Sequence, residues 1–86
     1  MIDKMEIVNK VLLVVDPMGL IYEEDEQYLE YQSETKEIVK YLENNVITIE
    51  SLARFIRNVF VWYFETCLEL DVCELIADCI MKNLTE

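Results

Sequence analysis

The residues with the clearest chemistry are carboxylates gathered in one stretch, with tyrosines among them. Residues 23–37 contain seven Asp or Glu side chains and one lysine, so they supply −6 of the chain's net charge of −11. Such a concentration either lies on a solvated face, where it only keeps the domain soluble, or meets a cationic partner. We favour a protein partner, because carboxylates attract a basic surface and tyrosines bury area at low entropic cost. The candidate partner-binding residues are Tyr22, Glu23, Glu24, Asp25, Glu26, Tyr28, Glu30, Tyr31 and Glu34.

Catalytic and metal chemistry fit this pattern poorly. Acid/base catalysis needs two carboxylates with different pKa values fixed across a cleft, and a calcium loop needs regularly spaced acids around a central glycine. The chain has no histidine and one glycine, which excludes Ser-His and Cys-His pairs and a glycine-rich phosphate loop. We therefore expect no enzyme activity, no metal site and no cofactor.

Charge and hydropathy also limit the partners. Seven basic residues against 18 acids disfavour nucleic acid, whose binding depends on cations that neutralise phosphates. The longest apolar runs, residues 11–15 and 59–64, are far shorter than the roughly 18 residues that a membrane span needs. The N-terminal residues lack the pattern of a secretory signal. We expect no membrane segment and a cytoplasmic location.

The three cysteines, Cys67, Cys73 and Cys79, fit neither a disulfide framework nor a zinc site. Their number is odd, and no histidine or close cysteine pair completes a set of four ligands. We expect reduced thiols that serve as small core residues.

The composition predicts one small all-α domain. The 86 residues are 53% hydrophobic, and one glycine and one proline leave little material for the many turns of a β fold. Apolar spacing predicts four helices, at about residues 4–15, 27–43, 49–65 and 72–84, packed as a four-helix bundle. Capping residues are expected at Asp3, Thr48 and Asp71, and helix ends at Asp16-Pro17 and Asn44-Asn45.

Two of these helices carry distinctive apolar faces. The second is expected to bury a stripe made of Tyr28, Tyr31, Thr35, Ile38, Val39 and Leu42. The third is apolar nearly all round, which predicts a central helix contacted on several sides. The same face could instead form a homodimer interface, since obligate interfaces resemble a cut core.

The order of motifs resembles a set of small helical bacterial proteins. An amphipathic helix is followed by Asp16-Pro17-Met18-Gly19-Leu20, then by the acidic segment Glu24-Asp25-Glu26-Gln27-Tyr28, and later by a helix that begins near residues 47–53. Val15 and Met18 stand where that set often has tryptophan and isoleucine. The set is similar to immunity proteins encoded beside polymorphic toxins, including those of contact-dependent growth inhibition systems.

This resemblance implies a function. The chain would bind and neutralise a cognate toxin domain, and a basic nuclease-type toxin would suit its acidic surface. Asp16, Pro17, Gly19, Glu24, Asp25 and Tyr28 match the pattern, and the first three also fit a purely structural turn. The alternative function is a homodimeric structural or regulatory domain whose acidic face only keeps it soluble.

Overall fold

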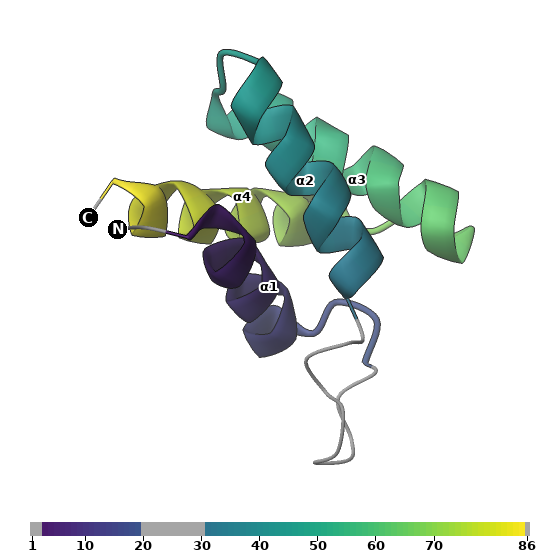
Figure 1. The fold of residues 1–86 in the computed structure, drawn as a ribbon. Helices are drawn as coiled ribbons and strands as arrows, with labels where there is room; N and C mark the ends of the chain where they lie inside the picture. Colours follow the sequence, from purple (N-terminus) through teal and green to yellow (C-terminus); the bar gives the residue numbers. More distant parts are fainter. Residues whose placement is uncertain (1–2, 20–30, 86) are drawn as a thin grey trace.

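The computed structural model describes residues 3–19 and 31–85, which contain four α-helices and no strand (Figure 1). These helices are α1 (Lys4–Val15), α2 (Gln32–Asn44), α3 (Ile49–Phe64) and α4 (Leu70–Leu84). The predicted all-α, four-helix domain is therefore confirmed.

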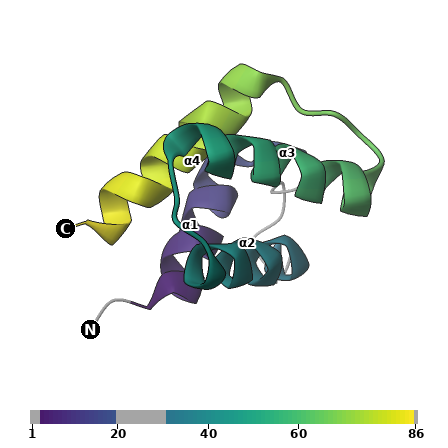
Figure 2. The same ribbon diagram turned by 90° about the horizontal axis from the view of Figure 1, so that it is seen from above.

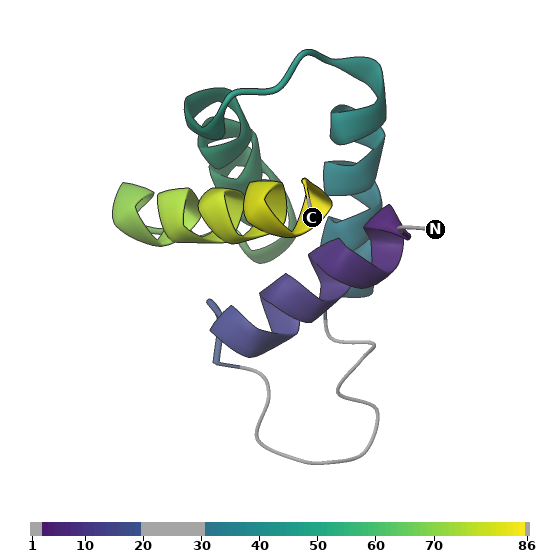
Figure 3. The same cartoon turned by 90° about the vertical axis from the view of Figure 1, so that its left-hand side faces the viewer.

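The helices cross one another instead of lying side by side along one axis (Figures 1 and 3). Helix α4 packs against α3 and α1, and α2 packs against α1 and α3. Each helix thus has two neighbours, and the core lies where the four inner faces meet.

The predicted caps are confirmed for two helices. The Asp3 carboxylate accepts hydrogen bonds from the backbone N–H groups of Met5 (3.0 Å) and Glu6 (3.4 Å) at the start of α1. At the start of α3, Thr48 and Ser51 form a capping box in which each side-chain oxygen accepts the other's backbone N–H. These bonds satisfy donors that the first turn of a helix cannot pair internally.

The predicted cap of α4 at Asp71 is wrong. The helix begins at Leu70, Glu69 occupies the N-cap position without a side-chain hydrogen bond, and Asp71 lies in the first turn. The cause is that acidic side chains in a first turn also complement the helix dipole, so they resemble a capping pattern without forming one.

The second helix begins later than predicted and ends where predicted. It starts at Gln32, and Tyr31 precedes it with a non-helical backbone. Tyr28, the first residue of the expected stripe, lies outside the described residues. Asn45 is extended and ends the helix, as its sequence position indicated.

The core collects aliphatic side chains from all four helices around Phe60 and Tyr31. In α2 the expected stripe is confirmed for Thr35, Ile38 and Val39, which are buried. The ring of Tyr41 stacks on Phe55 with centroids 4.1 Å apart, which joins the second half of α2 to the first half of α3.

The last turn of α3 departs from the expectation of a helix contacted on every side. Trp62 is 81% exposed, and its neighbours Val61 and Tyr63 are exposed as well. The ribbon shows why, because the end of α3 continues past its crossing with α4 before the chain turns back (Figure 2).

The cysteines are all free thiols, but only part of the expectation for them holds. Cys73 is buried and Cys79 is half-buried against the core, as expected. Cys67 is exposed, because it lies in the connection between α3 and α4 and not on a helix face.

None of the described helices combines the length and the apolar character needed to cross a membrane.

The exposure difference along α3 predicts unequal effects of two aromatic substitutions. Phe60→Ala should lower the free energy of unfolding by about 3–5 kcal/mol, because it removes a fully buried ring from the centre of the core. Trp62→Ala is the matched control and should change it by less than about 1 kcal/mol. Urea unfolding followed by circular dichroism measures both, and equal losses would contradict the described end of α3.

Candidate partner-binding site

The only predicted partner-binding residues within the described part of the chain are Tyr31 and Glu34. The other seven, Tyr22, Glu23, Glu24, Asp25, Glu26, Tyr28 and Glu30, lie outside the described residues. What the structure defines is how the chain is held on either side of that stretch, at Met18 and at Tyr31.

The Tyr31 hydroxyl joins these two positions. It donates a hydrogen bond to the Asp16 carboxylate (2.6 Å) and accepts one from the backbone N–H of Met18 (3.1 Å). We call the three residues Asp16, Met18 and Tyr31 the tyrosine clamp. Because it spans 15 residues of sequence, it brings the chain after α1 next to the chain before α2.

The turn at the end of α1 positions Asp16 and Met18, the two clamp residues that bind the Tyr31 hydroxyl. Asp16 is the C-cap residue, has a left-handed backbone (φ 48°) and donates its N–H to the carbonyl of Leu12 (2.8 Å). The Gly19 N–H then donates to the Asp16 carbonyl (3.0 Å), and Gly19 has φ 65°, a conformation that glycine adopts without strain. The predicted ending of the first helix at Asp16-Pro17 is confirmed.

The aromatic ring anchors the second half of the clamp in the core. Tyr31 is completely buried, and its ring centroid lies 6.0 Å from that of Phe60 and 6.4 Å from that of Phe64. The two phenylalanine rings are themselves stacked 5.4 Å apart. One side chain therefore connects the end of α1 and the start of α2 to the second half of α3.

The expected place of Tyr31 and Glu34 on a contact surface is wrong. Tyr31 has no exposed surface and Glu34 is 4% exposed. For Tyr31 the reason is the clamp, which holds its hydroxyl on Asp16 and the Met18 N–H while the ring packs in the core. Tyr31 therefore fixes the chain at the start of α2 and does not itself present a face to a partner.

Glu34 is a buried carboxyl group in the first turn of α2. Burial raises its pKa, and a hydrogen bond with its own backbone N–H opposes that rise. The next residue, Thr35, donates its hydroxyl to the Asn9 side chain (3.3 Å), which ties the first turn of α2 to α1. The first turn of α2, which carries Glu34, is therefore part of the contact between α1 and α2.

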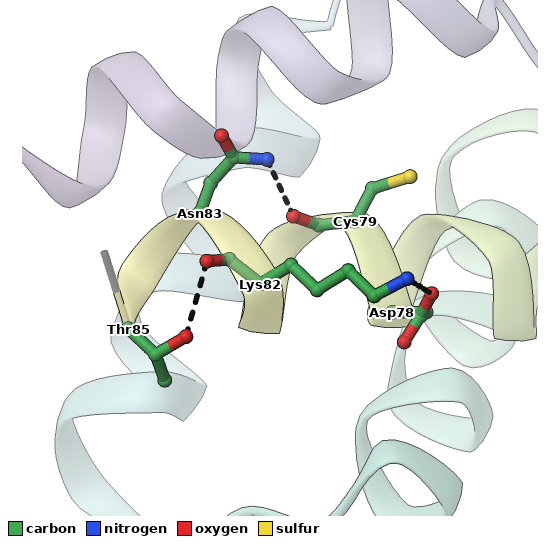
Figure 4. A network of polar contacts seen from close by, with 5 residues as sticks. All are labelled: Asp78, Cys79, Lys82, Asn83 and Thr85. Atoms are coloured by element: carbon green, nitrogen blue, oxygen red, sulfur yellow. Dashed lines mark hydrogen bonds and ion pairs between the residues drawn. The ribbon is translucent and has the colours of Figure 1, made fainter.

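A groove of about 430 Å³ lies between α1 and the end of α4. Its apolar lining includes Ile7 and Val11, and its polar lining includes Lys10 and Asn83. Figure 4 shows Asn83 and Cys79 on the side of α4 that faces α1. The Asn83 side-chain amide donates a hydrogen bond to the Cys79 carbonyl (2.7 Å), one turn earlier in α4. This bond fixes the orientation of Asn83 in the wall of the groove.

A solvent-exposed side of the end of α4 carries an ion pair. Lys82 lies 2.9 Å from Asp78, one turn earlier, and this hydrogen bond raises the pKa of Lys82 (Figure 4). A cation near a helix C-terminus also interacts favourably with the helix dipole. We therefore assign this ion pair a role in stabilising α4.

A second set of exposed acidic residues, around the end of α3 and the start of α4, does not follow from the sequence pattern. Helical spacing from Leu52 predicts Trp62 and Tyr63 in the core, whereas the structure exposes both, and Glu65 and Glu69 are exposed in the same segment. A signal was present in the sequence, because no lysine or arginine occurs between Arg57 and Lys82.

No group of three or more metal-ligating side chains occurs among residues 3–19 and 31–85. The described site offers charge, aromatic contacts and a fixed backbone frame. No protein-family model, curated protein or solved structure matches the chain. The function is therefore argued from the site itself.

The tyrosine clamp predicts that removing the Tyr31 hydroxyl oxygen lowers the stability of the fold. Tyr31→Phe keeps the buried ring but removes the hydroxyl that binds the Asp16 carboxylate and the Met18 N–H, so the free energy of unfolding should fall by about 1–3 kcal/mol. Tyr41→Phe is the control, because no hydrogen bond of its hydroxyl occurs within the described residues. Urea unfolding of both variants tests this, and a Tyr31→Phe protein as stable as Tyr41→Phe would show that the hydroxyl contributes nothing.

The raised pKa of Glu34 predicts that replacing it with glutamine, its neutral isostere, increases the free energy of unfolding in a pH-dependent way. Because the folded state binds the Glu34 proton more tightly than the unfolded state, this group's contribution to stability falls as pH rises from about 4.5 through the folded pKa. Glu34→Gln removes that loss. Its advantage over the wild type should therefore grow with pH and reach on the order of 1 kcal/mol at neutral pH.

Glu37→Gln, one turn along the same helix and less buried, is the matched control for this measurement. Urea midpoints at several pH values from acid to neutral compare the three proteins. An advantage of Glu34→Gln that is constant with pH, or largest in acid, would show that Glu34 is not destabilised by burial of its charge.

Proposed function

We propose that this chain is an immunity protein that binds and neutralises a basic toxin domain, of nuclease type, in the cell that makes it. The observation that carries the proposal is the tyrosine clamp. It fixes Met18 and Tyr31, which bracket the acidic, tyrosine-containing stretch, against a packed core. A binding segment whose ends are held loses less conformational entropy when a partner binds.

The surface charge supports a cationic partner. Eight of the 12 acidic residues in the described part of the chain are exposed, and the whole chain has 18 acids against seven bases. Long-range attraction from such a surface raises the rate of encounter with a basic protein. The same charge repels nucleic acid and anionic membranes.

The mechanism follows from the chemistry of nuclease clefts. A protein that cleaves nucleic acid holds phosphates with lysine and arginine, and carboxylates can occupy those positions instead. Glu23, Glu24, Asp25, Glu26 and Glu30 would supply charge, and Tyr22 and Tyr28 would supply aromatic anchors. Tyr31 and Glu34 are excluded from direct contact by their burial and act through the frame.

The alternative, a homodimeric structural or regulatory domain, is favoured by one observation. Val61, Trp62 and Tyr63 are exposed apolar side chains at the end of α3, as a subunit interface would require. Two copies that each carry a net charge of −11 repel one another, which makes this the weaker proposal.

The direct experiment is affinity isolation from the native host. The tagged chain is purified at low salt and eluted with rising salt, and a stoichiometric basic protein that the chain inhibits would support the proposal. Recovery of the chain alone, as a dimer, would support the alternative.

The charge mechanism predicts a salt-dependent association rate. Replacing Glu24, Asp25 and Glu26 with alanine should slow association with the isolated toxin by about tenfold or more at low salt, and far less at high salt. The control replaces Glu6, Glu43 and Glu50, three exposed acids elsewhere, with the same change of net charge. Association rates of the two triple variants are measured by stopped flow or surface plasmon resonance. Equal slowing of association by both variants would assign the effect to net charge alone.

A further inference from the structure

The end of α3 exposes an unusual amount of apolar side chain for so small a domain. Eight large hydrophobic residues are exposed in the described part of the chain, and five of them lie within residues 61–75. The largest is Trp62, at 81% exposure, in the last turn of α3. We call this region the α3 end surface; its apolar members are Val61, Trp62, Tyr63, Leu70 and Leu75.

These side chains are exposed because of the crossing of α3 and α4, and not because the helix is loosely packed. Phe60 is fully buried and Phe64 packs against the core, so the inner face of the same turn is anchored. The outer face receives no cover, since the chain leaves α3 beyond α4 and returns through residues 65–69 (Figure 2). An exposed tryptophan on a rigid turn suits a binding anchor.

The connection beside this turn is also held in place. The Arg57 Nε–H donates a hydrogen bond to the Cys67 sulfur (2.9 Å), which fixes the middle of the connection against α3. The carbonyl of Glu69 then accepts from the N–H groups of Val72 and Cys73 and starts α4. The segments that carry the exposed residues, at the end of α3, in the connection and at the start of α4, are thus all held in place.

The charges around the exposed residues are mainly negative, although the guanidinium of Arg57 lies beside them on Cys67. Four exposed acids, Glu65, Glu69, Asp71 and Glu74, lie within the same segment, and none of them has an ion-pair partner within the described residues. No lysine or arginine occurs in residues 58–81.

This negative charge distinguishes between two possible partners for the surface, a second copy of the chain and a basic protein. A second copy of the chain would bring two sets of these carboxylates together and would desolvate them without a counter-charge. A basic protein would pair with them, and an arginine could at the same time lie on the indole face of Trp62, the aromatic ring that attracts cations most strongly. Charge complementarity therefore favours a cationic occupant.

We propose that the α3 end surface is a docking site for a cationic, arginine-bearing protein surface, with Trp62 as its anchor and Glu65, Glu69 and Glu74 as its charge partners. It rests on the proposed function for the identity of the partner as the toxin, and it adds a contact region distinct from residues 22–30. The chain would then engage its partner at two acidic surfaces.

The test uses a defined probe, a labelled synthetic peptide rich in arginine and leucine, together with the full chain. Trp62 is the only tryptophan, so its fluorescence reports this surface alone. Free protein should emit as hydrated indole, and the peptide should shift the emission to shorter wavelength. The same peptide with glutamate in place of each arginine should cause no shift.

Peptide anisotropy measures the affinity of the variants. Trp62→Ala, and separately the triple change of Glu65, Glu69 and Glu74 to glutamine, should each raise Kd by about tenfold or more. Val46→Ala, an apolar residue with 97% exposure, is the control for the first variant. Glutamine at Glu6, Glu43 and Glu50 is the charge-matched control for the second.

Three results would overturn the proposal. The first is peptide binding that leaves Trp62 emission unchanged and is lost only when Glu24, Asp25 and Glu26 are replaced, which would leave the proposed function intact. The second is equal binding of the glutamate peptide. The third is a shift of Trp62 emission with protein concentration alone, together with a dimer by sedimentation, which would assign the surface to a second copy.

Discussion

The hydroxyl group of Tyr31 is the interaction on which the arrangement of this domain depends. Helix α1 ends at Asp16 and α2 begins at Gln32, and the two helix ends meet because that hydroxyl binds both the Asp16 carboxylate and the Met18 N–H. The ring below it packs on Phe60 and Phe64. The polar end of a core side chain is thus hydrogen-bonded to Asp16 and Met18, as a buried hydroxyl requires.

The same constraint explains where the domain tolerates unfavourable local features. Glu34 is buried next to the clamp, where its charge is poorly solvated, and Asp16 adopts a left-handed backbone that costs a non-glycine residue stability. Glu65 also adopts a left-handed backbone, at the end of α3, where its negative charge interacts unfavourably with the helix dipole. These departures flank the two acidic regions that we assign to partner binding, and functional regions are where such departures concentrate.

Much of the fold follows from the sequence because local signals coincide with helix ends. Asp3, Thr48 and Asn45 act within a few residues of themselves, and their roles are confirmed. Gly19 likewise has the left-handed backbone that a turn after proline indicated. The start of α2 could not be predicted in this way, since it depends on a contact between Tyr31 and Asp16 that spans 15 residues.

The candidate site is less predictable for a related reason. Tyr31 carries two conflicting signals, because helical spacing places it in the buried stripe of the second helix while its acidic neighbours suggest a contact surface, and its long-range contacts show that it is a core residue. Trp62 is the reverse case, because helical spacing predicts it in the core with Val59 and Tyr63. Its exposure depends on where α4 crosses α3, which is a property of packing between helices and not of the α3 sequence.

The role of the tyrosine clamp is tested by amide hydrogen exchange at Met18, in the wild type and in Tyr31→Phe. We expect the Met18 N–H to exchange slowly in the wild type, because it donates to the Tyr31 hydroxyl, and to lose this protection in the variant while amides in the middle of α3 remain protected. A Met18 amide that exchanges equally in both proteins would contradict this role. The acidic stretch would then have no fixed frame, and the proposed mode of binding would lose its structural basis.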